Sequence, residues 1–229
     1  MFWNKIKKKN ESIILNNNPY YLKILEEVKL DIIVNENISS KLVIIANSNY
    51  DINIKLNKGA NLTINSLNKD NNTNIYICLN EKANITYHHS SLAKENSINN
   101  INILHQANDS VSNINNNGIN INNGKLFFTI NGIISKDLNN IICNQKSKII
   151  NYHLGNSKII PNLIIDSNDI IASHAAYIGK IDDEDMFYMQ SRGIKKEDIE
   201  KIIYKAILLG IMELNEEKEE FDKILNEWW

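Results

Sequence analysis

Cysteine and proline are both scarce in this chain of 229 residues. The two cysteines, Cys78 and Cys143, lie far apart, and neither has a second cysteine at metal-ligand spacing, so the sequence predicts neither a disulfide framework nor a zinc site. We interpret them as buried thiols in a reducing compartment. The two prolines, Pro19 and Pro161, leave the stretch between them free of residues that cannot donate to a β-ladder.

A surplus of one charge and a long apolar run are missing too. The 25 basic residues nearly balance the 27 acidic ones, so the chain carries no electrostatic footprint for a nucleic acid. No run approaches the roughly 18 apolar residues of a membrane span, and the apolar run 13–15 behind the N-terminal lysines is too short for a signal peptide. We therefore expect a cytoplasmic protein with neither a nucleic acid nor a membrane as its partner.

Short alternating runs of Ile, Leu, Val and Asn fill the middle of the chain, a pattern typical of half-buried strands. Residues 51–64 (DINIKLNKGANLTI) recur as residues 74–87 (NIYICLNEKANITY), 23 residues further along. A spacing in the low twenties without an intervening helix favours a coil of a parallel β-helix. The alternative is an antiparallel sandwich, for which tight hairpin turns are few, Asn117-Gly118 and Asn131-Gly132 being the candidates.

The pattern changes near the C-terminus. From Lys195 apolar residues recur at helical spacing, and a second helical run covers 216–229. We expect a mainly β protein, a single-stranded β-solenoid with a C-terminal α-helical subdomain. Its parts would be an N-terminal extension (1–29), whose residues 19–29 could form a short helix or a first strand, a β-helix core (30–181) and a C-terminal helical region (182–229). These helices either cap the open end of the solenoid or dock a partner.

Residues 161–194 carry the most specific pattern, PNLIIDSNDIIASHAAYIGKIDDEDMFYMQSRGI. In order and without gaps they combine a proline-led strand, a Ser-His-Ala-Ala turn, Ile-Gly, an acidic helix start, Phe-Tyr and Ser-Arg-Gly-Ile. This combination resembles the closing part of the SufB/SufD core, from the SUF system of iron–sulfur cluster assembly. Upstream, LFFTINGIIS at 126–135 resembles a recurrent rung of that family.

The resemblance implies a right-handed parallel β-helix flanked by helices, and a scaffold role in a SufBCD-type complex. It implies that the chain pairs with a SufB-type chain or with a second copy of itself, and offers its C-terminal helices to a SufC-type ATPase. An iron–sulfur cluster would be assembled transiently at the interface and not be bound permanently. The chain lacks a G-x-x-x-x-G-K-[ST] run, so ATP hydrolysis would belong to SufC and this chain would not be an enzyme.

His174 is the candidate iron ligand implied by the resemblance, and neutral imidazole suits iron. The alternative is a histidine that hydrogen-bonds within its turn and only holds the end of the solenoid. Ala172 stands where many SufD-like chains carry cysteine, and Ala175 replaces the family's glycine or glutamate, so the chain looks SufD-like and a partner would supply thiolate and carboxylate. Cys143 is weighed as a sulfur acceptor against a buried structural thiol, because neither cations nor a helix N-terminus stand near it.

Six residues are the candidate contacts with SufC: Phe187, Tyr188, Arg192, Gly193, Ile199 and Ile203. Arg192 is the single arginine and falls inside the family segment, which suggests a bidentate or stacked contact that lysine could not make. The alternative is an intrachain salt bridge to the acidic residues 182–185. Those acids are themselves expected at the start of a short helix.

The other histidines read as structural. His88 and His89 are consecutive in a strand and so point to opposite faces, while His105 and His153 have strand-like surroundings. Among rival functions, a polysaccharide lyase or hydrolase would need clustered carboxylates on adjacent coils, and a hexapeptide-repeat acyltransferase would need a six-residue period. Neither pattern is present. A module that only pairs with SufB and binds SufC, without cluster chemistry, stays open because of Ala172.

Overall fold

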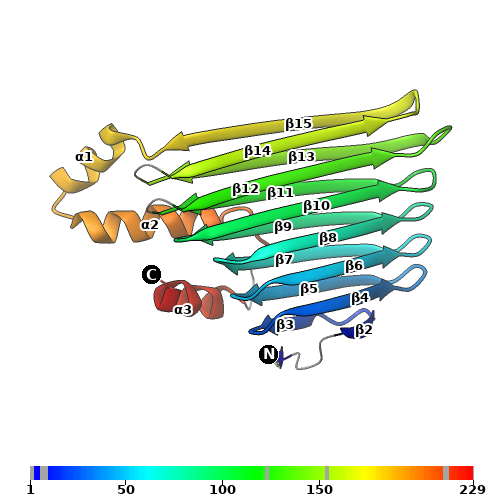
Figure 1. The fold of residues 1–229 in the computed structure, drawn as a ribbon, viewed down its shortest axis with the longest axis horizontal. Helices are drawn as coiled ribbons and strands as arrows, with labels where there is room; N and C mark the ends of the chain where they lie inside the picture. The colour runs from blue at the N-terminus through cyan, green and yellow to red at the C-terminus, as the bar shows by residue number, and fades with distance from the viewer. Residues whose placement is uncertain (1–2, 6–9, 122–123, 153–154, 214–216, 229) are drawn as a thin grey trace.

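The computed structural model describes residues 3–5, 10–121, 124–152, 155–213 and 217–228. Within them the strands form two parallel sheets, one of odd-numbered and one of even-numbered strands (Figure 1). The odd sheet contains β1 (Asn4–Lys5), β3 (Tyr20–Ile24), β5 (Ser39–Ala46), β7 (Asn61–Lys69), β9 (Asn84–Ala93), β11 (Val111–Asn120), β13 (Asn139–Asn151) and β15 (Asp169–Lys180). The even sheet contains β2 (Asn10–Leu15), β4 (Val28–Val34), β6 (Tyr50–Leu56), β8 (Asn72–Leu79), β10 (Asn96–His105), β12 (Lys125–Ile134) and β14 (Asn156–Ile165).

The predicted repeat is the register of the solenoid. Ile52 of β6 lies opposite Ile75 of β8, and Ile64 of β7 lies opposite Tyr87 of β9, as the alignment of 51–64 with 74–87 requires. Every strand pairing among the described residues is parallel. The β-helix prediction is therefore confirmed and the antiparallel sandwich is excluded.

Asparagine ladders run along the outside of the coils. Asn53 donates to Asp31, 22 residues earlier, at 2.8 Å, whereas Asn162 donates to Asn131, 31 residues earlier, at 2.7 Å. The side-chain amide is both donor and acceptor, so it can hydrogen-bond to the coil before it and the coil after it. The same ladders show that the coils lengthen toward the C-terminus. The asparagine content thus has a structural use that composition alone did not reveal.

The corners between the two sheets also stack. Asn37, Gly59, Lys82 and Asp109 occupy successive corners with positive φ. The amide of Asn37 donates to the carbonyl of Lys58 at 3.0 Å, and Gly59 and Lys82 make the same kind of bond to the next corner. Asn, Asp and Gly are the residues that tolerate this left-handed backbone best.

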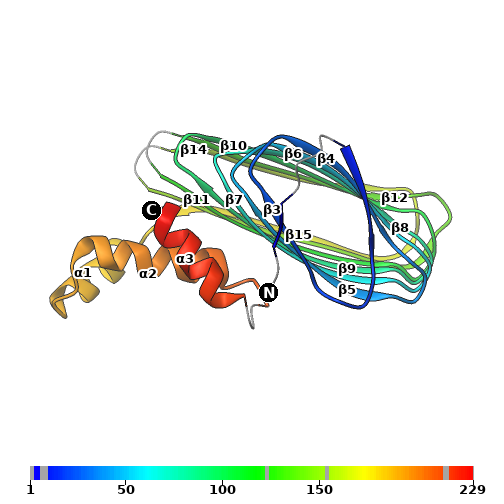
Figure 2. The ribbon, with the colours of Figure 1, turned by 90° about the horizontal axis from the view of Figure 1, so that it is seen from below.

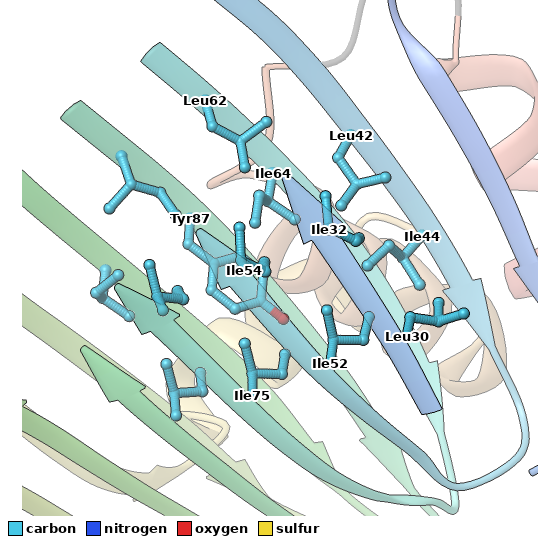
Figure 3. Packing of buried hydrophobic residues seen from close by; sticks show 14 of the residues in the cluster. Leu30, Ile32, Leu42, Ile44, Ile52, Ile54, Leu62, Ile64, Ile75 and Tyr87 are labelled. Carbon is cyan, nitrogen blue, oxygen red and sulfur yellow. The ribbon is translucent and has the colours of Figure 1, made fainter. Parts of the chain in front are cut away.

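The core fills the space between the sheets with aliphatic side chains. Ile52, Ile54, Ile64, Ile75 and Tyr87 meet there in Figure 3, all of them fully or almost fully buried. Burial of Val, Leu and Ile side chains stabilises a fold by about 1.5–3 kcal/mol each. The N-terminal segment also joins this packing. Residues 19–29, for which helix and strand were both open, form β3 and the start of β4.

Three helices follow the solenoid: α1 (Asp183–Ser191), α2 (Lys196–Leu209) and α3 (Lys218–Trp228). Of these, α2 and α3 lie beside the odd sheet, whereas α1 extends past the ends of the strands (Figures 1 and 2). Tyr204 and Leu208 of α2, with Phe221 of α3, pack in one cluster with outward side chains such as Val43 and Leu92. The helices therefore cover part of a sheet face and do not cap the last coil. None of these described helices has the length and hydropathy that crossing a membrane requires.

Polar side chains of the odd sheet hold the C-terminal end of α2. The last carbonyls of a helix lack intrahelical donors. Here two strands supply donors to the last turn of α2, and two neighbouring strands supply donors to the segment that follows it. Lys41 and Asn65 donate to the carbonyl of Glu213 at 3.0 and 3.2 Å, Ser90 donates to that of Leu208, and Asn117 donates to that of Ile207 at 2.6 Å. The orientation of α2 on the sheet is thereby fixed.

Candidate functional site

The last coil, β14 and β15, forms an open end of the solenoid. Among the described residues β14 pairs only with β12 and β15 only with β13, and both lie at one extreme of the molecule (Figure 1). Ile171 and Tyr177 of β15 and Ile164 of β14 are exposed there, Ile171 by 66%. Natural edge strands are usually protected by charges, proline or short length. Pro161 provides such protection within β14, because it has no N–H to donate, but β15 is long and has no such protection in its centre.

His174 lies in the centre of β15, on the face that continues the interior; the prediction of a turn at residues 173–176 is wrong, because these residues continue the ladder with β13. Successive side chains of a strand alternate between faces. Ala172 packs beside Cys143 in the core, whereas Ser173 donates to Asn144 at 2.7 Å on the outside. His174 therefore shares the inner face with Ala172. Its side chain is nevertheless exposed, because no described strand follows β15 in the sheet.

Gln145 is the register partner of His174 on β13. Its side chain is buried, with 3% exposed, and Nε2 donates to the backbone carbonyl of Asn162 at 3.1 Å. The side-chain oxygen, Oε1, has no hydrogen-bond partner. The site thus pairs an exposed imidazole with a buried amide oxygen.

Cys143 lies in register with Ala172, on the inner face next to the same site. It is fully buried, and burial raises the pKa of its thiol, although a hydrogen bond with Ser112 opposes this. Cys78 is half-buried on the other sheet, its thiol donates to Gln106 at 2.8 Å, and burial raises its pKa as well. Both are free thiols. For Cys78 burial outweighs the opposing charge of Lys55, its register partner on β6, so burial favours inert thiols over reactive thiolates at both positions.

The described part of the chain contains no group of three or more His, Cys, Asp and Glu side chains that could hold a metal ion. Among these residues His174 is therefore not part of a three-ligand group. Iron in a cluster needs several ligands, usually thiolates with occasional imidazoles. A metal site at His174 would need further ligands besides the described residues of this chain.

A second exposed surface lies on α1 and the turn after it. Asp182 caps α1 by accepting from the amide of Glu184 at 2.9 Å, and the following acidic residues occupy its first turn, as expected. No residue of α1 is buried. Phe187 is 73% exposed and Tyr188 59%. Large exposed aromatic side chains close together mark an interaction surface.

Arg192 stacks on Tyr188. Its guanidinium carbon lies 5.1 Å from the ring centroid, and Nη2 donates to the phenol oxygen at 3.0 Å. Among the described residues it forms no ion pair with the acids 182–185. Arg192 thus makes a stacked contact within the chain, and its contact with SufC stays a prediction. Gly193 follows with φ +83° and lets its amide donate to Gln190 at 2.9 Å, which ends the helix.

The two α2 candidates differ in exposure. Ile199 is fully buried and Ile203 only partly exposed, so Ile199 supports the helix packing and does not line an outer surface. Ile194 and Ile202, which the sequence analysis did not select, are exposed. We use the name α1–α2 surface for the following exposed side chains: Phe187, Tyr188, Arg192, Ile194 and Ile202.

A groove of about 330 Å³ links this surface to the end of β15. Lys180, Ile181 and Phe187 are among the residues that line it. Tyr152, directly after β13, also lines it, and its phenol hydrogen-bonds to the carboxylate of Glu200 on α2. Only two residues separate β15, which carries His174, from the start of α1.

The remaining histidines are structural where they are described. His89 is buried inside, where Nδ1 is 2.9 Å from the hydroxyl of Ser66, whereas His88 lies on the outer face next to Asn115. Their predicted placement on opposite faces is confirmed. His105 is buried between Ser110 and Ser112, at 2.8 and 2.9 Å. His153 lies outside the described residues.

Gln145 and Tyr152 are the site residues that sequence reasoning missed. The repeat at 23 residues holds for the coils between β6 and β9, but Gln145 lies 29 residues before His174, as the pairing of Ser173 with Asn144 shows. A constant period of 23 residues therefore predicts the wrong register partner for His174. Only the lengthening of the coils, visible in the asparagine ladders, could have indicated the correct one.

Comparison with known proteins gives one family. A family model described as "SUF system FeS cluster assembly, SufBD core domain" matches residues 29–207. This range includes most of the solenoid, all of α1 and most of α2.

Curated relatives align over a shorter stretch. The chain is 38% identical over 52 residues to "Iron-sulfur cluster assembly protein SufD" of Bacillus subtilis (strain 168), and 42% identical over 53 residues to the protein of the same name in Escherichia coli (strain K12). It is 40% identical over 48 residues to a protein of the SufBD family from Mycobacterium leprae (strain TN). The aligned stretch covers 20–23% of this chain and 12% of each relative.

Proposed function

Since this chain belongs to the SufB/SufD family of the SUF iron–sulfur cluster assembly system, we propose that it is a cytoplasmic scaffold subunit that pairs through its last coil and binds a SufC-type ATPase through its α1–α2 surface. The names of its relatives describe assembly proteins, which fits a scaffold better than a carbohydrate-active enzyme. The nascent cluster is the cargo of this scaffold.

The open edge of β15 is the observation that carries the proposal. A long edge strand with exposed apolar side chains is ready to pair with another chain. Ile171 and Tyr177 lie on that strand, on either side of His174. A SufB-type chain, or a second copy of this chain, would continue the sheet there and cover these side chains.

The same pairing would complete the chemistry around His174. An imidazole is one ligand, and the described residues hold no three-ligand group. The SufB-type partner would add the thiolate and carboxylate that Ala172 and Ala175 cannot provide. The cluster would then form at the interface and leave it afterwards.

SufC binding is assigned to the α1–α2 surface because α1 buries none of its side chains within the chain. Aromatic and arginine side chains are the residue types that most often dominate interface energies. The short link from β15 to α1 gives the bound ATPase a direct connection to the strand with His174.

A second candidate is an interaction module without cluster chemistry. Ala172 in place of a cysteine, and the lack of a three-ligand group among the described residues, favour this reading. Such a module would still pair with SufB and bind SufC. His174 would then contribute only to the structure of the last coil.

Co-purification of the chain with SufC and a SufB-type partner tests the proposal, followed by anaerobic reconstitution with iron and sulfide. We expect a stable complex whose cluster content falls strongly in His174→Ala, with His88→Ala as a matched histidine control that retains the cluster. Failure to bind SufC would refute the assignment. A complete complex in which His174→Ala keeps full cluster content would select the interaction module.

A further inference from the structure

We propose that Gln145 is a positioning residue for His174: its side-chain oxygen accepts a hydrogen bond from one ring N–H, so that the other ring nitrogen faces the open end. The inference rests on the proposed function for its purpose. The contact itself can be tested without any partner.

Register places the two side chains together. Gln145 and His174 are direct partners in the pairing of β13 with β15, and both lie on the inner face by the alternation of the strands. Neighbouring strands are about 4.8 Å apart. The structure shows no hydrogen bond between the two side chains, but an imidazole and a carboxamide on such positions are near enough to form one after a rotation of either side chain.

The orientation of the Gln145 amide follows from its one hydrogen bond. The backbone carbonyl of Asn162 can only accept, so the NH₂ group of Gln145, and not its oxygen, faces it at 3.1 Å. The oxygen then points elsewhere in a buried position and has no partner. Buried polar atoms are almost always hydrogen-bonded in folded proteins.

His174 is the polar neighbour that can supply this partner. On the other side of Gln145, the register partner on β11 is Ile114, a buried aliphatic side chain. Ile114 can neither donate nor accept. The row Ile114, Gln145, His174 therefore offers the amide oxygen one polar side chain, toward the open end.

Gly132 of β12 makes room for this arrangement. A methyl group at Gly132 would lie 2.8 Å from Nε2 of Gln145 and 2.7 Å from Sγ of Cys143. A distance under about 3 Å cannot be tolerated without movement of the neighbour. The glycine thus leaves room for the NH₂ group of Gln145 next to β12.

The chemical consequence concerns the tautomer. A neutral imidazole has one N–H donor and one lone pair. If the oxygen of Gln145 accepts a hydrogen bond from the ring N–H, the lone pair is on the other ring nitrogen, which faces out of the last coil. Metal-ligating histidines commonly donate their other ring N–H to a carbonyl oxygen, and loss of that partner typically costs 10–100-fold in metal affinity.

Nitrogen NMR of the ¹⁵N-labelled full chain in mildly alkaline buffer tests the contact, with the ring signals of His174 assigned by their loss in His174→Ala. We expect a ring N–H proton of His174 that exchanges slowly with water. In Gln145→Met, which keeps the side-chain volume but removes the acceptor, this proton should exchange at least about tenfold faster. Ser147→Ala is the matched control, because Ser147 is another buried inward polar residue of β13 but lies opposite Ala176.

A second measurement connects the contact to the cargo. In the complex with SufC and a SufB-type chain, anaerobic Fe(II) titration should show affinity reduced by about 10–100-fold in Gln145→Met and unchanged in Ser147→Ala. Thermal unfolding of each variant verifies that it is folded. A His174 ring proton that already exchanges freely in the wild type, or that is unchanged in Gln145→Met, overturns the inference. Slow exchange that depends on Gln145, with cluster content insensitive to His174→Ala, would instead keep the contact and refute the proposed function.

Discussion

Tyr152 hydrogen-bonds through its phenol to the carboxylate of Glu200, and so joins the end of β13 to the second turn of α2. The carboxylate is buried, with only 8% of the residue exposed. The bond raises the pKa of the Tyr152 phenol. The bond connects the end of the strand that carries Gln145 to the helices that we propose bind SufC.

Tyr152→Phe should therefore loosen α2. Removing the donor leaves the buried carboxylate of Glu200 with one fewer partner, and we expect a loss of about 1–3 kcal/mol in the free energy of unfolding. Denaturant unfolding measures the loss, and hydrogen exchange of the α2 amides locates it. Tyr177→Phe, at an exposed tyrosine of β15, is the control and should change stability by less than about 0.5 kcal/mol. Equal effects of the two substitutions would contradict the anchoring role.

Acid should destabilise the fold through its interior histidines. Burial lowers the pKa of His89 and of His105 from 6.5 to about 4. Because the folded pKa lies below the unfolded one, the unfolded chain binds more protons between these values. Stability is then complete above about pH 6.5 and falls as pH decreases toward 4, by about 2 kcal/mol for each histidine at pH 5.

Urea unfolding at pH 7 and pH 5 measures this dependence. His105→Gln can keep hydrogen bonds to Ser110 and Ser112 but cannot take up a proton in this range, so the difference in unfolding free energy between the two pH values should shrink by about 2 kcal/mol. A difference equal to that of the wild type would show that His105 does not cause the acid sensitivity.

Pairing through β15 should be blocked by a charge on its exposed edge. Ile171→Lys places an ammonium group on the strand proposed to contact the partner, and burying it there would be costly. We expect loss of the SufB-type chain in co-purification with unchanged thermal stability of the monomer. Ile14→Lys on β2 is the matched control, since Ile14 is 64% exposed at the opposite end of the solenoid. If both variants retain the partner, pairing does not use this edge.

SufC binding should depend on Phe187. Phe187→Ala removes an aromatic ring that is 73% exposed and contributes to no buried cluster, so we expect the dissociation constant for SufC to rise by at least about tenfold while the fold keeps its stability. Calorimetric titration with purified SufC measures the change. Tyr76→Ala, an exposed aromatic on the uncovered face of the even sheet, should bind as the wild type does. Comparable weakening by Tyr76→Ala would mean that the contact surface lies elsewhere.

The solenoid could be predicted from sequence because its register is local. The match of Ile52 with Ile75 needs only two neighbouring coils of equal length, and such a pair is visible as a repeat. The C-terminal helices were predicted equally well from their period. Asp182 and its acidic neighbours begin α1 as expected, since N-capping depends on the few residues at the start of the helix.

The site could be predicted only in part. His174 and the aromatic pair at 187–188 were found through a family pattern, but the burial of Ile199 depends on packing against the rest of the fold. The pairing of Gln145 with His174 depends on the length of one particular coil. Neither property is contained in the residues themselves, because each is set by segments distant in the chain.

The lengthening of the coils limits how this protein can change in evolution. A duplicated coil of 23 residues would stack on the narrow N-terminal part, where neighbouring coils have 22 and 23 residues. At the wide end the duplicated coil would meet coils of 29 and 31 residues. Its corners would then not stack on the corners of these longer coils. We expect insertions and deletions of whole coils among relatives to be confined to the narrow part, which leaves the distance between His174 and α1 the same in all of them.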